Sequence, residues 1–112
     1  MTRRNVIAVS EHPNVLPLEG EIDLHVSPRV AISVAQIIGK KPPKLVVDLS
    51  RVTYIDSSGL AVLIEAMQNV ERYGGKLAIA GMQETVQSIF EIARLDQVFR
   101  IFPNVETALA AD

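Results

Sequence analysis

Two aspartates and two serines are the side chains whose type and spacing could support a functional site. The segment Asp56-Ser57-Ser58-Gly59 separates a short apolar run, 44–49, from a helical pattern of apolar residues that starts at Leu60. The N-terminus of a helix leaves backbone N–H groups without intrahelical partners and favours negative charge. A small hydroxyl residue at such a junction is exposed and easily modified. The sequence therefore predicts that this junction is the functional centre.

Asp23 has a similar position, because it follows a predicted strand and precedes a helix predicted to begin at Ser27-Pro28. In parallel sheets, the loops after the carboxyl ends of the strands form the functional edge. If the strands before Asp23 and Asp56 are parallel and close, both carboxylates lie at that edge. The alternative is structural: Asp56 as the N-cap of a helix and Asp23 as the cap of a turn.

Apolar patterns define the elements that must position these residues. Strands are predicted at 5–10, 15–19, 44–49, 76–80 and 98–102, and the first two form a hairpin around His12-Pro13-Asn14. Helical spacing predicts one helix between each later pair of strands and another after Asn104. This alternation predicts one α/β domain over residues 1–112, with a mixed, mostly parallel sheet, an N-terminal hairpin and about four helices.

Composition excludes several classes of function. A net charge of −2 over 112 residues offers no broad attraction to nucleic acid or anionic membranes. The absence of cysteine excludes thiolate catalysis, and two histidines leave little for a metal centre or a catalytic triad. The sequence lacks a P-loop, a Gly-x-Ser-x-Gly elbow and any stretch long enough to span a membrane. We expect a cytoplasmic, non-enzymatic domain without metal or cofactor.

Four segments, in this order and spacing, resemble the STAS family, which is named for sulfate transporters and anti-sigma factor antagonists. They are Gly20-Glu21-Ile22-Asp23, Leu45-Val46-Val47-Asp48-Leu49-Ser50, Tyr54-Ile55-Asp56-Ser57-Ser58-Gly59-Leu60 and Gly74-Gly75-Lys76-Leu77. The resemblance covers nearly all of the chain and implies a STAS fold and a bacterial anti-anti-sigma factor. At Ala93 the family often has a glycine, a departure that affects a helix end and not the signature loop.

The resemblance implies that the unphosphorylated chain binds an anti-sigma factor that is also a serine kinase, and so releases a sigma factor. The kinase modifies the serine after the loop aspartate, here Ser57, and a PP2C-type phosphatase reverses the modification. With Asp56 as N-cap, Ser57 is the exposed first helical residue, while Ser58 turns toward the sheet or bonds locally. The predicted partner surface contains Asp23, Asp56, Ser57, Ser58 and Gly59, on a monomer or weak dimer.

Two other functions remain open at this point. A STAS module in a stressosome-like scaffold or a lipid transporter would use the same surface for permanent binding. A small-ligand domain would hold a nucleotide or lipid in a pocket at the edge of the sheet. An enzyme is the least favoured alternative, because the sequence contains no recognisable catalytic constellation.

Overall fold

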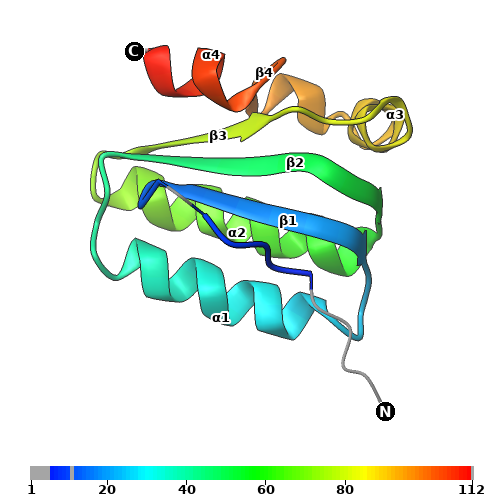
Figure 1. The fold of residues 1–112 in the computed structure, drawn as a ribbon, viewed down its shortest axis with the longest axis horizontal. Helices are drawn as coiled ribbons and strands as arrows, with labels where there is room; N and C mark the ends of the chain where they lie inside the picture. The colour runs from blue at the N-terminus through cyan, green and yellow to red at the C-terminus, as the bar shows by residue number, and fades with distance from the viewer. Residues whose placement is uncertain (1–5, 11, 112) are drawn as a thin grey trace.

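Four parallel strands form one sheet in the order β1-β2-β3-β4 in the computed structural model, which describes residues 6–10 and 12–111 (Figure 1). The strands are β1 (Val15–Ile22), β2 (Lys44–Ile55), β3 (Lys76–Ala80) and β4 (Arg100–Phe102). The helices are α1 (Ser27–Ile38), α2 (Ser57–Arg72), α3 (Glu84–Ile92) and α4 (Val105–Ala110), with a short 3-10 helix, η1 (Leu95–Gln97). The α/β class, the parallel sheet and the four helices are confirmed.

The apolar run in β2 is buried on both faces of the sheet, as its composition predicts. Leu45 and Val47 pack into the main core, which also contains Val30 of α1 and Leu63 of α2. Val46 points the other way, into a smaller cluster that α4 covers. Figure 1 shows α1 and α2 together on one side of the strands and α4 on the other. Burial on both faces explains why this strand has almost no polar alternation.

The N-terminal hairpin is reduced to a single antiparallel bridge, between Ile7 and Leu18. The Ala8 N–H donates to the Pro17 carbonyl at 3.0 Å, and the Glu19 N–H donates to the Val6 carbonyl at 2.8 Å. Proline has no N–H to return a bond to Ala8, so the ladder cannot extend. The expectation of a regular strand at 5–10 was therefore wrong for residues 6–10, and residue 5 lies outside the described residues.

The second strand of the core, β2, continues to Ile55, six residues beyond its predicted end at Leu49. Its pairing with β1 contains two register shifts, between Pro17 and Glu19 and between Gly20 and Glu21. At each shift β2 advances one residue more than β1, which is the geometry of a β-bulge. Consequently three residues at a spacing of three, Leu49, Val52 and Ile55, are all buried. A search for two-residue alternation misses such a strand.

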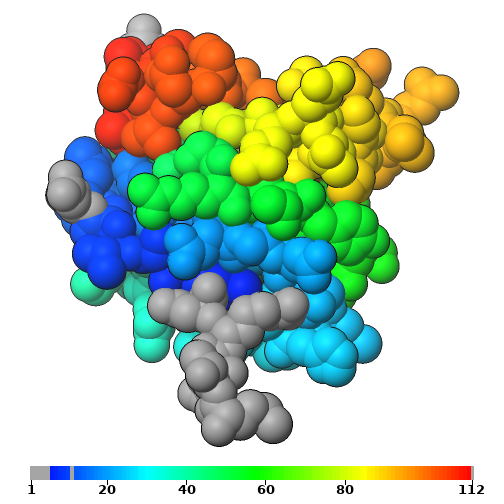
Figure 2. Space-filling view, turned by 45° about the vertical axis from the view of Figure 1, so that its right-hand side comes forward, coloured from blue at the N-terminus to red at the C-terminus, as the bar shows by residue number. Residues whose placement is uncertain are grey.

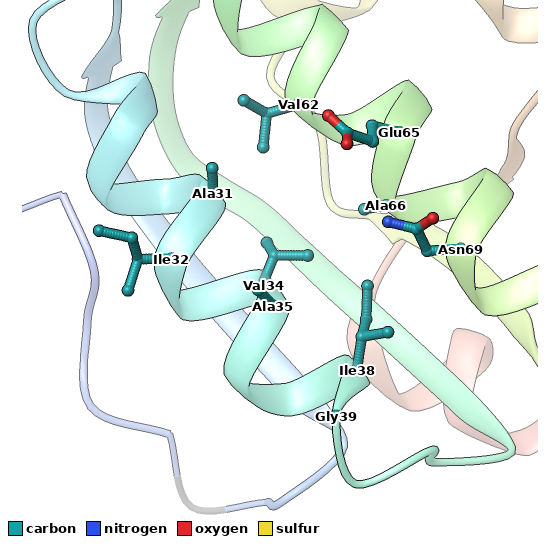
Figure 3. Close-up of a pocket in the computed structure, with 10 residues that line it drawn as sticks. All are labelled: Ala31, Ile32, Val34, Ala35, Ile38, Gly39, Val62, Glu65, Ala66 and Asn69. Atoms are coloured by element: carbon teal, nitrogen blue, oxygen red, sulfur yellow. The ribbon is translucent and has the colours of Figure 1, made fainter.

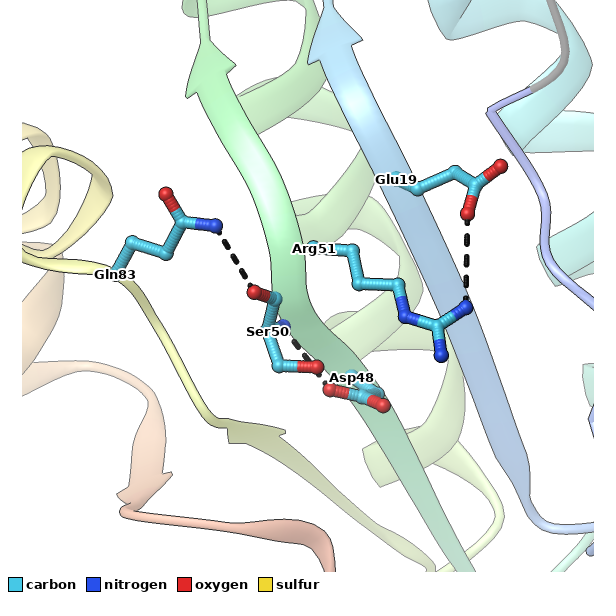
Figure 4. A network of polar contacts seen from close by, with 5 residues as sticks. All are labelled: Glu19, Asp48, Ser50, Arg51 and Gln83. Atoms are coloured by element: carbon cyan, nitrogen blue, oxygen red, sulfur yellow. Dashed lines mark hydrogen bonds and ion pairs between the residues drawn. The ribbon is translucent and has the colours of Figure 1, made fainter.

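Side chains replace the missing sheet partners of Ser50, at the first bulge (Figure 4). The neighbouring strand β3 pairs with β2 only as far as Asp48. Beyond that point the Ser50 N–H donates to Asp48 Oδ1 at 3.0 Å, and Gln83 Nε2 donates to the Ser50 carbonyl at 3.0 Å. Arg51 of β2 and Glu19 of β1 form an exposed ion pair at 3.8 Å, a contact that stabilises little in water. The two hydrogen bonds of Ser50 therefore do most to support the half of β2 that leads to Asp56.

The first helix begins at Ser27, as predicted, and has no side-chain cap. Ser27 is already the first residue of α1 and is buried, and Val26 occupies the cap position without a side-chain hydrogen bond. The main-chain carbonyl of Asp23 accepts the N–H groups of Val26 at 3.1 Å and Ser27 at 2.8 Å. The preceding turn therefore satisfies backbone donors that a cap would otherwise take.

Candidate functional site

Asp23 and Asp56 lie at the same edge of the sheet. Their strands, β1 and β2, are parallel neighbours, and the last residues of the two strands, Ile22 and Ile55, are register partners. The Asp56 N–H donates to the Ile22 carbonyl at 3.0 Å, which joins the two segments directly after the strands. In the view of Figure 2 the β1–α1 segment (light blue) and the β2–α2 segment (green) lie against each other. The two strands are parallel neighbours, so the expected placement of both aspartates at one edge of the sheet is confirmed.

Asp56 is the N-cap of α2, as one of the sequence-based alternatives proposed. Its backbone is extended (φ −99°, ψ −176°), and Oδ1 accepts the N–H groups of Ser58 at 2.9 Å and Gly59 at 3.2 Å. The Ser58 hydroxyl donates to the same oxygen at 2.6 Å. The aspartate therefore has a structural role whatever else it does.

Hydrogen bonding keeps Asp56 charged. The Ser58 hydroxyl is the main cause that lowers the pKa of the Asp56 carboxyl, while burial acts in the opposite direction. The backbone N–H groups of Gly59, Ser58 and Leu24 lower this pKa further. Because Leu24 belongs to the β1–α1 turn, the Asp56 carboxyl faces that turn as well as the start of α2.

The two serines differ in their surroundings. Ser57 is exposed at the first position of α2, and no hydrogen bond of its hydroxyl is found among the described residues. Ser58 is half-buried, and its hydroxyl bonds to Asp56. Both placements agree with the helical geometry that the sequence predicts. Of the two hydroxyls, that of Ser57 is the one open to a second protein.

Asp23 holds the turn that leads into α1. Its Oδ1 accepts the His25 N–H at 3.0 Å, an Asx turn, in addition to the two bonds that its main-chain carbonyl accepts. The side chain is half-buried. Leu24 occupies the corner of this turn with 69% of its surface exposed. Asp23 therefore lies at the edge of the sheet and also stabilises the turn before α1.

Gly59, which belongs to the surface predicted to bind a partner, is buried. A Cβ at this position would lie 2.7 Å from Ile55 Cγ1 and 2.9 Å from Ile22 Cγ2. Real Cβ atoms do not approach other atoms so closely, so glycine is what allows α2 to start directly above the strand ends. Sequence reasoning missed this packing role, because it depends on Ile22, which lies 37 positions before Gly59 in the chain.

A cavity of about 460 Å³ lies between α1 and α2, away from this edge (Figure 3). Its walls are mostly apolar, including Val34, Ile38 and Val62, with Glu65 and Asn69 as the polar members. None of the predicted site residues lines it. Among the described residues there is no group of His, Cys, Asp or Glu that could hold a metal ion, and no helix is long and apolar enough to cross a membrane.

Comparison with known proteins adds three findings. The STAS domain model matches residues 6–108. The chain is 35% identical over 89 residues to the anti-sigma-B factor antagonist of Listeria monocytogenes, which covers 78% of this chain and 75% of that protein. Its fold matches an anti-sigma factor antagonist from Mycobacterium paratuberculosis with a TM-score of 0.82 and 26% identity, over 92% of this chain and 89% of the other.

A third relative has been solved in a modified state. The Bacillus cell fate determinant SpoIIAA in its phosphorylated form matches with a TM-score of 0.68 and 19% identity, over 92% of this chain and 94% of that chain. At this identity the likeness concerns the fold alone. The family match, by contrast, covers nearly the whole sequence. The chain therefore belongs to the STAS domain family, among relatives that are anti-sigma factor antagonists.

Proposed function

We propose that this protein is a phosphorylation-switched anti-sigma factor antagonist. In the unphosphorylated state it binds an anti-sigma factor that is also a serine kinase, and this binding frees a sigma factor. The observation that carries the proposal is the exposed hydroxyl of Ser57 at the start of α2, next to the ionised cap Asp56. Listeria monocytogenes has a related antagonist of an anti-sigma factor, which supports the same role here.

The proposed switch is phosphorylation of Ser57 by the kinase and its reversal by a PP2C-type phosphatase. A phosphate adds about −1.5 to −2 charge. The helix N-terminus tolerates an anion, so the fold can remain unchanged. A partner surface that fits a neutral hydroxyl would instead meet added bulk, charge and bound water. A change of about 2 to 3 kcal/mol, or roughly 30- to 150-fold in affinity, is the expected scale.

The proposed partner surface is centred on Ser57 and includes Asp23, Asp56 and Ser58. Gly59 belongs to the same segment but is buried, so it shapes this surface from below rather than touching a partner. Asp23 and Asp56 lie on adjacent segments joined by a backbone hydrogen bond. A partner that covers Ser57 would therefore reach both. We place this binding in the cytoplasm and assign the protein no enzymatic activity of its own.

The direct test starts from a purified complex of the sigma factor and the kinase anti-sigma factor of the same organism. Added unphosphorylated protein should displace the sigma factor, which size-exclusion chromatography would detect as free sigma factor. Protein fully phosphorylated on Ser57 should leave the complex intact. A permanent scaffold component would bind equally well in both states. No displacement by either form would refute the antagonist function.

A further inference from the structure

Two exposed apolar side chains belong to the segments that carry Asp23 and Asp56. Large apolar residues are exposed at six described positions: Val9, Leu24, Ile32, Tyr54, Ile92 and Val98. Only two of these six belong to the segments that carry the aspartates of the edge. Leu24 follows Asp23 directly and is 69% exposed, and Tyr54 lies two residues before Asp56 and is 45% exposed. The strand positions of Glu21 and Tyr54 are register partners, so both segments end at the same place.

We propose that Leu24 and Tyr54 are the apolar anchors by which this surface binds the anti-sigma factor. This inference rests on the antagonist function proposed above and names the part of the surface that supplies affinity. Interfaces gain most of their binding energy from a few well-packed side chains, often aromatic, near their centre. Exposed apolar side chains at the edge that carries the modifiable serine fit that role, since water is released when a partner covers them.

The turn holds Leu24 in place before any partner arrives. Its N–H faces the Asp56 carboxyl closely enough to lower the pKa of that group. The hydrogen bond from the His25 N–H to Asp23 Oδ1 closes the turn around Leu24. Val26, which follows the turn, is 2% exposed and fixes its end in the core. A side chain presented on a fixed backbone loses less conformational entropy on binding than one on a mobile loop. Leu24 is thus presented on a fixed turn at the edge of the sheet that also carries Ser57.

The surroundings of Leu24 indicate the chemistry of the partner. Glu21 and Asp23 precede it, and its N–H faces the Asp56 carboxyl and lowers the pKa of that group, so acidic residues border the apolar anchor. The complementary surface is an apolar recess with basic side chains at its margin. The same arrangement suits a switch: a phosphate on Ser57 would hold water at the edge that a partner must dehydrate in order to bury Leu24.

The test compares matched substitutions of exposed apolar residues. Leu24→Ser and Tyr54→Ser alter the proposed anchors, whereas Ile92→Ser alters a side chain that is 84% exposed at the end of α3. Affinity for the purified kinase anti-sigma factor of the same organism is measured by calorimetry, and circular dichroism checks that each variant melts as the wild type does. We expect each anchor variant to bind about tenfold or more weakly, and Ile92→Ser to bind within about twofold of wild type.

The outcomes separate this inference from the function on which it rests. If the wild type binds and the anchor variants bind equally well, the anchors are wrong and the antagonist function stands. If Ile92→Ser weakens binding as much as Leu24→Ser, the partner does not use this edge selectively and the inference is also overturned. If the wild type does not bind, both the function and the anchors fail. Should Leu24→Ser lower the melting temperature, Leu24→Lys, which keeps an aliphatic stem but adds a charge, replaces it and should also weaken binding.

Discussion

The Ser58 hydroxyl donates a 2.6 Å hydrogen bond to Asp56 Oδ1, and this bond separates the roles of two adjacent serines. Ser58 and Asp56 together complete the N-terminus of α2, where the carboxylate also accepts two backbone N–H groups. Ser57, one residue earlier, stays exposed. Ser58 is thus part of the helix cap, whereas Ser57 remains at the surface.

The first prediction concerns which serine accepts phosphate. Incubation with the kinase anti-sigma factor and ATP should add one phosphate to the wild type and to Ser58→Ala, and none to Ser57→Ala. The reason is that Ser57 is exposed, whereas a kinase would have to break the bond between Ser58 and Asp56. Intact-mass analysis measures the outcome. Phosphate on Ser57→Ala but not on Ser58→Ala would reverse the assignment.

The second prediction concerns pH. The pKa of Asp56 is lowered in the folded state, so its contribution to stability is complete above the ordinary aspartate pKa of about 3.9 and disappears as pH falls through the lower folded value. Asp56→Ala should therefore reduce the free energy of unfolding by about 1 kcal/mol at pH 7 and at pH 5, and by less near pH 3. Urea unfolding at the three pH values measures this difference.

The control for this experiment is Asp96→Ala, which removes an exposed carboxylate from η1. It should change the free energy of unfolding by no more than about 0.5 kcal/mol at pH 7. An Asp56→Ala deficit that grows as the pH falls would contradict the sign of the pKa change.

The third prediction concerns the packing of Gly59. Gly59→Ala should destabilise the protein by about 1 to 3 kcal/mol, because the new methyl group must displace Ile55 or Ile22. Gly39→Ala is a suitable control, since a Cβ there would meet only ordinary contacts of 3.4 Å or more, and its φ of −57° suits alanine. The control should be neutral or slightly stabilising. Equal melting temperatures for the two variants would show that α2 can shift without cost.

The fourth prediction separates the structural and binding roles of Asp23. Asp23→Asn keeps a side-chain oxygen that can accept the His25 N–H, but it removes the charge. We expect a melting temperature within about 2 °C of wild type and weaker binding to the kinase anti-sigma factor. Asp23→Ala, which removes the acceptor as well, should lower the melting temperature. If Asp23→Asn binds normally, the carboxylate serves only the turn.

The parts of the fold that could be predicted from sequence are those with a local physical signal. The run from Leu45 to Val47 predicts a strand buried on both faces, and the cap position of Asp56 follows from the helical pattern after it. Given parallel neighbouring strands, the proximity of Asp23 and Asp56 follows as well.

Other features depend on contacts that no local pattern records. The bulges of β2 bury Leu49, Val52 and Ile55 at a spacing of three, which resembles neither a regular strand nor a loop. The need for glycine at position 59 arises from Ile22, which another strand brings into contact. The N–H of Leu24 faces the Asp56 carboxyl of another segment and lowers its pKa, a relation that the sequence around Leu24 does not record. The one local signal for an exposed apolar side chain at this edge is the presence of an apolar residue directly after Asp23.

The central claim is that phosphate on Ser57 switches binding to the anti-sigma factor. The most direct measurement is the affinity of the kinase anti-sigma factor for two preparations of this protein, one unphosphorylated and one carrying a single phosphate on Ser57, under identical salt and pH. We predict that the phosphorylated form binds roughly 30- to 150-fold more weakly, while both forms melt at similar temperatures. Equal affinities, with the phosphate verified on Ser57, would contradict the account.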